Sequence, residues 1–222
     1  MHKNSKLHAM VVTGIAALGL ATIAPHQANA AACTTSDVSL TIGSTNYAAD
    51  ACANSVNNGN PTVETNNLNN AFGTTYTFLS KADNGSAGSS GITLSGIEIW
   101  VSSVSNGSTG TWTLNWLDTN GPSPANLPIE LSLIVGLFGG STGSGYLIDN
   151  VILPDSPYTG QGSFTITFTN GGGQNPAISH LDLLGGDVTT PLHTSPVPEP
   201  MSVALLATGL LGHGATHLRR RR

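Results

Sequence analysis

The chain has few charged residues, and its long central part has almost no basic ones. Its 222 residues include 7 lysines and arginines and 12 aspartates and glutamates. Between Ala31 and Ser195, Lys81 stands alone against eleven acidic residues, which gives a net charge of −10. Such a surface repels phosphate groups and offers no arginine to bind them. We therefore expect neither nucleotides nor nucleic acid among its partners.

Cysteine is almost absent, since the chain has only Cys33 and Cys52. Neither has a histidine or a basic residue beside it in sequence, so the electropositive setting of a catalytic cysteine is missing. In an exported protein, two cysteines form a disulfide by default. A Cys33–Cys52 bridge would close a loop of about 20 residues, stabilise the fold by about 3 kcal/mol and hold the start of the domain.

The usual signatures of catalysis are missing as well. There is no Gly-x-Ser-x-Gly motif, and His180 is the one histidine of residues 31–190. His180 and Asp182 fall on the same face of an expected strand, which is typical of a hydrogen-bonded surface pair. The glycine-rich segment 139–145 lacks the lysine of a phosphate-binding loop. We expect that the protein is not an enzyme and has no catalytic residues.

Two alternatives that use acidic residues stay open. A secreted glycoside hydrolase needs two carboxylates on neighbouring strands; Glu98, Glu130 and Asp149 are candidates, although no spacing identifies a pair. Calcium needs oxygen-rich loops, and the sequence supplies three short Asp/Asn segments but no Asp-x-Asp-x-Asp loop (83–84, 118–120, 149–150). We predict no metal site and no cofactor, with Ca²⁺ as the alternative.

The N-terminus has the parts of a secretory signal peptide. A start with two lysines precedes an apolar run, Met10–Ala24, which a proline then closes. Small residues at 28 and 30 form the pattern that signal peptidase accepts. We predict that residues 1–30 are removed by signal peptidase, at a site defined by Ala28, Ala30 and Ala31.

Residues 31–190 show period-two alternation of apolar and polar residues between glycine- and asparagine-rich turns. This alternation is typical of strands with one buried and one exposed face. The clearest runs are 97–101, 111–116 and 163–168, and about eight strands are expected when weaker runs are included (38–42, 76–80, 129–138, 146–153, 178–184). We predict an all-β fold, a single β-sandwich of the jelly-roll kind at residues 31–190.

One stretch interrupts this pattern, since residues 54–70 include eight asparagines. Within it Glu64, Leu68 and Phe72 recur at intervals of four, the spacing of one helix face. We predict one short helix that lays Leu68 and Phe72 on the sandwich, with Thr62 as its N-cap and Gly73 as its stop.

The C-terminus combines three features in order. A proline-rich linker, residues 191–200, ends in Val197, Pro198, Glu199 and Pro200. An apolar segment follows at 201–218, and at about 1.5 Å per residue it spans about 27 Å as a helix, close to a bilayer's core. Four arginines end the chain and resist translocation: Arg219, Arg220, Arg221 and Arg222. We predict a transmembrane helix at 201–218 with residues 219–222 as its cytoplasmic membrane stop.

This order of features resembles the PEP-CTERM sorting signal of bacterial surface proteins, over residues 197–222. The resemblance implies an exosortase as partner, a membrane-embedded transpeptidase-like enzyme of Gram-negative bacteria that make exopolysaccharide. That enzyme would act near 198–200, so this chain is its substrate. A weaker resemblance to exported domains that precede such signals rests on the paired early cysteines, on the helix end 71–73 and on the strand 178–181, and it supports the fold. A plain C-terminal membrane anchor is the alternative.

These observations favour an inner-membrane-anchored precursor that reaches the cell surface or the extracellular space. We expect a non-catalytic surface or matrix protein associated with exopolysaccharide or biofilm, with the membrane and a polysaccharide among its partners. The alternative is a carbohydrate-binding module in which Trp100, opposite in parity to its aliphatic neighbours, contacts a polysaccharide. A secreted glycoside hydrolase is the second alternative.

Overall fold

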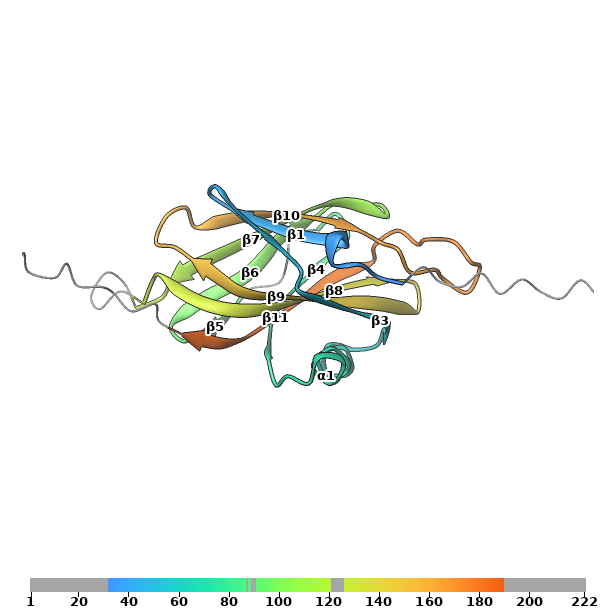
Figure 1. Cartoon of the computed structure of the whole chain (residues 1–222), viewed down its shortest axis with the longest axis horizontal. Helices are drawn as coiled ribbons and strands as arrows, with labels where there is room; N and C mark the ends of the chain where they lie inside the picture. Colours follow the sequence, from blue (N-terminus) through green and yellow to red (C-terminus); the bar gives the residue numbers. More distant parts are fainter. Residues whose placement is uncertain (1–31, 87, 89–90, 121–125, 190–222) are drawn as a thin grey trace, which may run out of the picture.

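The computed structural model describes residues 32–86, 88, 91–120 and 126–189. Two antiparallel β-sheets pack face to face, and one α-helix, α1 (Pro61–Phe72), lies against the outside of the second sheet (Figure 1). The β-sandwich with one short helix is therefore confirmed, and the jelly-roll class stays a prediction. The signal peptide with its cleavage site, the linker with Val197–Pro200, the helix 201–218 and the arginines 219–222 lie outside the described residues. Within the described ranges, no helix has the length and apolar character needed to cross a bilayer.

The first sheet has six strands and the second has five. In spatial order the first sheet consists of β2 (Thr45–Ala48), β1 (Val38–Ile42), β10 (Thr159–Thr165), β7 (Thr109–Asp118), β6 (Ile97–Val104) and β5 (Ile92–Leu94). The second consists of β3 (Ala51–Asn57), β9 (Thr142–Leu153), β8 (Ile129–Gly139), β11 (His180–Thr189) and β4 (Thr77–Asp83). A short 3-10 helix, η1 (Thr35–Asp37), precedes β1.

The main core lies between the sheets and is built by the alternation seen in the sequence. On β7, Trp112, Leu114 and Trp116 all point inward and are fully buried. Phe164 of β10 and Ile166 just beyond it are buried in the same way. Burial of large apolar side chains is the dominant stabilising contribution in such a sandwich.

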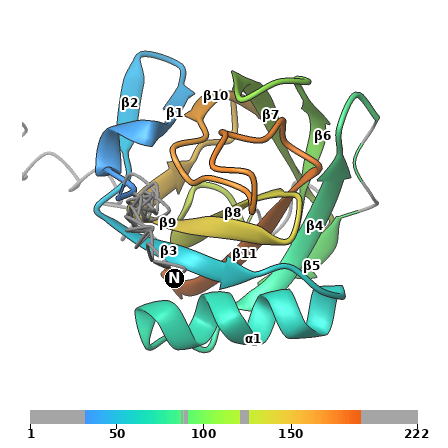
Figure 2. The same ribbon diagram turned by 90° about the vertical axis from the view of Figure 1, so that its right-hand side faces the viewer.

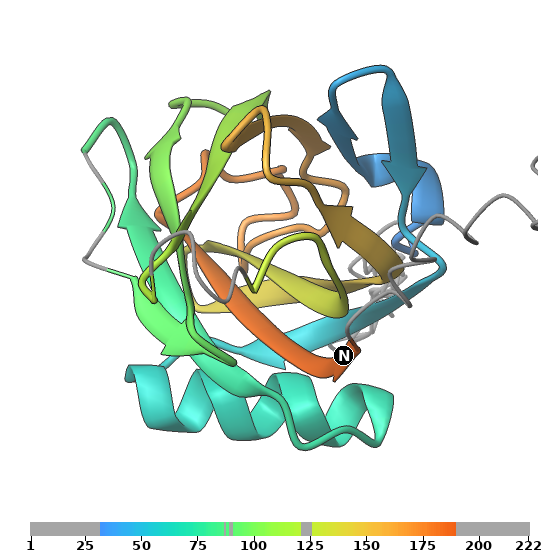
Figure 3. The same cartoon turned by 90° about the vertical axis from the view of Figure 1, so that its left-hand side faces the viewer.

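Strand β8 is buried on both faces because α1 covers the outside of the second sheet (Figures 2 and 3). Its inner face joins the main core, whereas Ile134 and Phe138 form a second apolar cluster with Leu68 of α1. Two glycines permit this close approach. A Cβ atom on Gly136 or Gly145 would lie 2.9 Å or 2.7 Å from a methyl carbon of Leu68.

The start of α1 differs from the prediction. Asn60, not Thr62, is the N-cap, and its side-chain oxygen accepts the Val63 N–H at 3.0 Å. Pro61 then occupies the first turn, where its missing N–H has no helical partner to lose. The predicted end is confirmed, since Gly73 caps the helix with a left-handed φ of 68°.

Several strand bounds also differ. Strands β2, β3 and β5 were not predicted, and β3 enters the asparagine-rich stretch as far as Asn57. These strands are largely exposed edges, so little apolar alternation marks them. Strand β10 ends at Thr165 although Phe168 beyond it is still buried, and β9 begins at Thr142, which shortens the expected turn 139–145.

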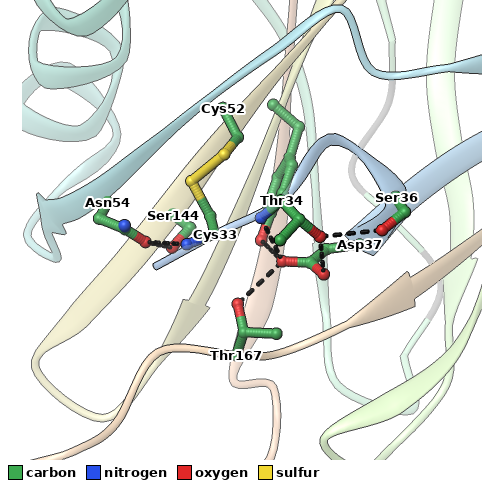
Figure 4. The surroundings of a disulfide bond; sticks show 9 residues. Cys33, Thr34, Ser36, Asp37, Cys52, Asn54, Ser144 and Thr167 are labelled. Atoms are coloured by element: carbon green, nitrogen blue, oxygen red, sulfur yellow. Dashed lines mark hydrogen bonds between the residues drawn. A yellow bond between two sulfur atoms is a disulfide. The ribbon is translucent and has the colours of Figure 1, made fainter. Parts of the chain in front are cut away.

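The predicted disulfide is present between Cys33 and Cys52 (Figure 4). It ties the segment before η1 to β3. Beside it the buried Asp37 carboxylate accepts hydrogen bonds from Thr34 N–H at 2.9 Å and from the Thr167 hydroxyl at 2.8 Å. These contacts fasten the beginning of the described chain to the sandwich.

Candidate functional site

Three ionisable side chains meet beneath α1, on the outer face of the second sheet. Glu64 comes from α1, and His180 and Asp182 come from β11. Their relative exposures are 0%, 6% and 0%. Glu64 Oε1 lies 3.2 Å from His180 Nε2, and Asp182 Oδ1 lies 4.0 Å from the same nitrogen. We call this buried group the acid–histidine cluster.

The alternation of β11 and the turn of α1 explain this placement. Leu181 and Leu183 face the main core, so His180 and Asp182 face the helix. Glu64 lies one helical turn before Leu68, which anchors α1 on the sheet. The four-residue spacing that predicts contact between Leu68 and the sheet therefore also places Glu64 in the interface between α1 and the sheet.

Two further contacts hold Glu64. The Gly59 N–H donates to Oε1 at 3.0 Å, and Lys81 Nζ lies 3.8 Å from Oε2. Lys81 belongs to β4, where its register partner is Asp182, and its side chain is 25% exposed. The single basic residue of the central sequence is thus placed at the cluster, where it offsets part of the negative charge.

Ser179 and Phe138 orient the imidazole of His180. The two rings stack with a centroid distance of 4.7 Å and an interplanar angle of 16°. The Ser179 hydroxyl donates to the Phe138 carbonyl at 2.9 Å, so its oxygen is left to accept from His180 Nδ1 at 3.1 Å. In the neutral imidazole this assigns the proton to Nδ1 and leaves the lone pair on Nε2, the nitrogen nearest the carboxyl groups.

The two carboxyl groups have opposite pKa shifts. Burial, a hydrogen bond with Glu64 and the Glu64 charge raise the pKa of Asp182 to about 8. Burial also acts to raise the pKa of Glu64, but the Gly59 N–H, Asp182, His180 and Lys81 together lower it below its usual value. Burial, and then the charge of Lys81, lower the pKa of His180. These opposite shifts favour a proton on Asp182 beside an ionised Glu64.

The expectation that His180 and Asp182 form a surface pair is wrong. Helix α1 covers the face of β11 that would otherwise be exposed, and both side chains are buried under it. Sequence reasoning also missed Glu64 as a member of the site. The available signal was its helical spacing with Leu68 and Phe72, which places a carboxylate on the buried face of a helix.

The cluster is not arranged as a serine–histidine–acid relay. The Ser179 hydroxyl proton goes to the Phe138 carbonyl, and the nitrogen beside Ser179 is itself a donor, so it cannot remove that proton. The acid–histidine cluster can instead hold a cation. Ligand atoms of Glu64, His180 and Asp182 all lie within 4.8 Å of one another.

The candidate carboxylates for glycoside hydrolysis are not all brought together. Glu98 alternates with buried Ile97 and Ile99 and so faces outward from the first sheet. Glu130 alternates with buried residues of β8 and faces outward from the second sheet, so the whole core separates it from Glu98. Asp149 lies on β9, also in the second sheet.

The Asp/Asn segments considered for calcium lie on separate elements. Asp83 ends β4, Asp149 and Asn150 lie within β9, and Asp118 ends β7. The Asp118 carboxylate accepts the Asn126 N–H at 2.7 Å and the Asn120 N–H at 3.0 Å, and these bonds, the Asn126 bond first, lower its pKa. Its oxygens are therefore already engaged by Asn120 and Asn126.

Two shallow hollows border α1. One, of about 260 Å³, lies beside its N-terminal half and is lined by Pro61, Thr62, Thr65, Asn66 and Phe78. The other, of about 280 Å³, lies beside β3 and is lined by Asn54, Ser55, Val56, Asn57, Asn67, Asn70 and Ala71. Trp100 is elsewhere, half-buried on β6 opposite Asn115 of β7.

Comparison with known proteins gives no relative. No protein family, no curated protein and no solved structure matches this chain.

Proposed function

We propose that the protein is an exported, non-catalytic surface or extracellular-matrix protein of a Gram-negative bacterium, sorted by an exosortase and associated with exopolysaccharide or biofilm. The observation that carries the proposal is the order of its C-terminal features: Val197–Pro200, an apolar segment, then Arg219–Arg222. The Cys33–Cys52 disulfide supports export, because such bonds persist in oxidising compartments. The net charge of −10 for residues 31–195 suits a hydrated matrix.

Each part of the tail has a role in this proposal. The apolar segment enters the inner membrane from the periplasmic side, and the four arginines keep its end in the cytoplasm. Pro198 and Pro200 keep the preceding linker extended, so that it exposes Glu199 and its neighbours to the processing enzyme. Signal peptidase removes residues 1–30 at the other end.

Intact mass spectrometry of protein recovered from the cell surface tests the proposal. The expected mass lacks residues 1–30 and everything after the Val197–Pro200 motif. A strain without exosortase should accumulate membrane-bound chains that retain Arg222. Surface-released protein whose mass still includes Arg222 would overturn exosortase sorting, and a periplasmic reporter fused after Arg222 would overturn the membrane topology.

A second candidate function is binding of a neutral carbohydrate by the first sheet. The half-buried Trp100 lies on the outer face of β6, opposite Asn115, and an aromatic ring with a nearby amide suits contact with sugar rings. Affinity electrophoresis in the organism's own polysaccharide measures it. Trp100→Ala should abolish the retardation, while Leu117→Ala, an exposed apolar residue of the neighbouring β7, should leave it unchanged. Equal retardation of wild type and Trp100→Ala would exclude this face.

A further inference from the structure

We propose that Glu64, His180 and Asp182 bind one divalent transition-metal cation of the Zn²⁺ class. The ligands are one oxygen of each carboxyl group and Nε2 of the imidazole. One nitrogen and two oxygen ligands suit Zn²⁺ and its first-row neighbours, whereas Ca²⁺ and Mg²⁺ prefer oxygen alone. The site is separate from the tail and does not depend on the proposed sorting.

The distances between the ligand atoms suit a single metal ion. With bonds of about 2.0–2.2 Å, two tetrahedral ligands of Zn²⁺ lie about 3.3–3.6 Å apart. Glu64 Oε1 and His180 Nε2 are already 3.2 Å apart, and Asp182 Oδ1 is 4.0 Å from the same nitrogen. The ligand atoms of all three residues lie within 4.8 Å of one another, so the Asp182 carboxyl group must move closer for all three to reach one ion.

Several buried polar atoms of the cluster are poorly satisfied by hydrogen bonds. His180 Nε2, both carboxyl oxygens of Asp182 and Glu64 Oε2 have no hydrogen bond of standard geometry within the described part of the chain. Asp182 is fully buried, and an unsatisfied buried carboxyl group is costly. A cation between these atoms would bond to His180 Nε2 and to one oxygen of each carboxyl group, and its binding would release the proton held between the carboxyl groups.

The imidazole is held in the way that metal-binding histidines usually are. Its Nδ1–H donates to Ser179 Oγ, and Ser179 is fixed in turn by the Phe138 carbonyl. Such an outer hydrogen bond sets the tautomer and aims the other nitrogen at the metal. The Gly59 N–H plays a similar part for Glu64.

Lys81 is the competing cation, because its Nζ lies 3.8 Å from Glu64 Oε2. That oxygen is not the one nearest His180, so Glu64 can bind a metal through Oε1 and keep Lys81 on Oε2. The Lys81 side chain is 25% exposed, so its ammonium can also turn toward water. A bound metal would join α1 to β11 and hold the helix on the second sheet.

Titration calorimetry of the whole chain, purified in detergent and freed of metal with EDTA, tests the proposal with ZnCl₂. We expect one Zn²⁺ site per chain and a Zn²⁺-dependent rise in melting temperature that CaCl₂ does not reproduce. Asp182→Asn should weaken the binding by about tenfold or more, because it replaces an anionic ligand by a neutral amide. Glu98→Gln, which removes one carboxylate from the outside of the other sheet, should bind Zn²⁺ like wild type.

Six other histidines lie outside residues 31–190, and they can bind Zn²⁺ adventitiously. Zn²⁺ affinity that is equal in wild type and Asp182→Asn would assign the metal to those histidines and overturn the proposal, as would an absence of binding. If Asp182→Asn does not fold, ¹⁵N NMR of the wild type decides. The Nε2 signal of His180 must shift with one equivalent of Zn²⁺, and an unshifted signal would equally exclude the site.

Discussion

Glu64 Oε1 on helix α1 lies 3.2 Å from His180 Nε2 on strand β11, and both side chains are buried. This contact joins α1, the one α-helix of the described residues, to the second sheet. Because the cluster lies in the interface rather than at the surface, changes to it should alter the stability of the fold.

Glu64→Gln should lower the free energy of unfolding by about 2 kcal/mol, measured by urea denaturation in EDTA. The substitution keeps the shape but removes the negative charge that faces Lys81 and His180. The cost is below that of a fully buried pair because Lys81 reaches solvent. Glu98→Gln on the first sheet is the matched control and should change stability by less than about 0.5 kcal/mol. Equal effects of the two substitutions would contradict a special role for Glu64.

Stability of the metal-free protein should fall as the pH rises from about 4 to about 8, through the contribution of Asp182. Its pKa is raised to about 8 in the folded protein, so the folded state holds a proton that the unfolded chain releases near its ordinary value of 3.8. The unfolded state binds fewer protons across this window, and each pH unit costs at most about 1.4 kcal/mol. Above pH 8 the contribution is lost completely.

Asp182→Asn removes this titration, so its stability relative to wild type should improve as the pH is raised from 5 to 8. Denaturation curves at several pH values in EDTA measure the difference. The lowered pKa of His180 acts in both proteins and destabilises them as the pH falls below 6.5, so only the comparison isolates Asp182. A difference that does not change with pH would show that Asp182 titrates normally.

Replacement of both Cys33 and Cys52 by serine should lower the free energy of unfolding by about 3 kcal/mol. The disulfide closes a loop with a sequence separation of 19, and its removal restores the entropy of that loop to the unfolded chain. Guanidinium denaturation of the double variant, compared with wild type under oxidising conditions, measures the loss. Under reducing conditions the two proteins should become equally stable.

Gly162→Ala should destabilise the main core by about 1–3 kcal/mol. A Cβ atom at this position of β10 would lie 2.0 Å from the indole of the fully buried Trp112, so the ring must move. Gly171→Ala is the control, because a Cβ there meets no atom within 4 Å. Thermal denaturation followed by tryptophan fluorescence should show a lower melting temperature and a changed native spectrum for Gly162→Ala alone.

The strands that face the core were predictable because the alternation of apolar and polar residues within each strand shows which side chains are buried. Trp112, Leu114 and Trp116 alternate with polar residues, and this local pattern suffices to identify β7. The edge strands β2 and β5 were not predictable in this way, since neither buries a regular apolar face. The N-cap was misplaced by two residues because asparagine and threonine are both good caps, and only the Asn60–Val63 hydrogen bond distinguishes them.

By itself, the sequence determined the sandwich, the short helix and the partnership of the only two cysteines, since these follow from local periodicity and from composition. Only the tertiary structure decided that Glu64, His180 and Asp182 meet and are buried. Their alternation with leucines says which face of β11 they occupy, but it does not say that a helix covers that face. Whether a strand face is buried depends on which element packs against it. Here that element is α1, whose Leu68 packs closely against Gly136 and Gly145.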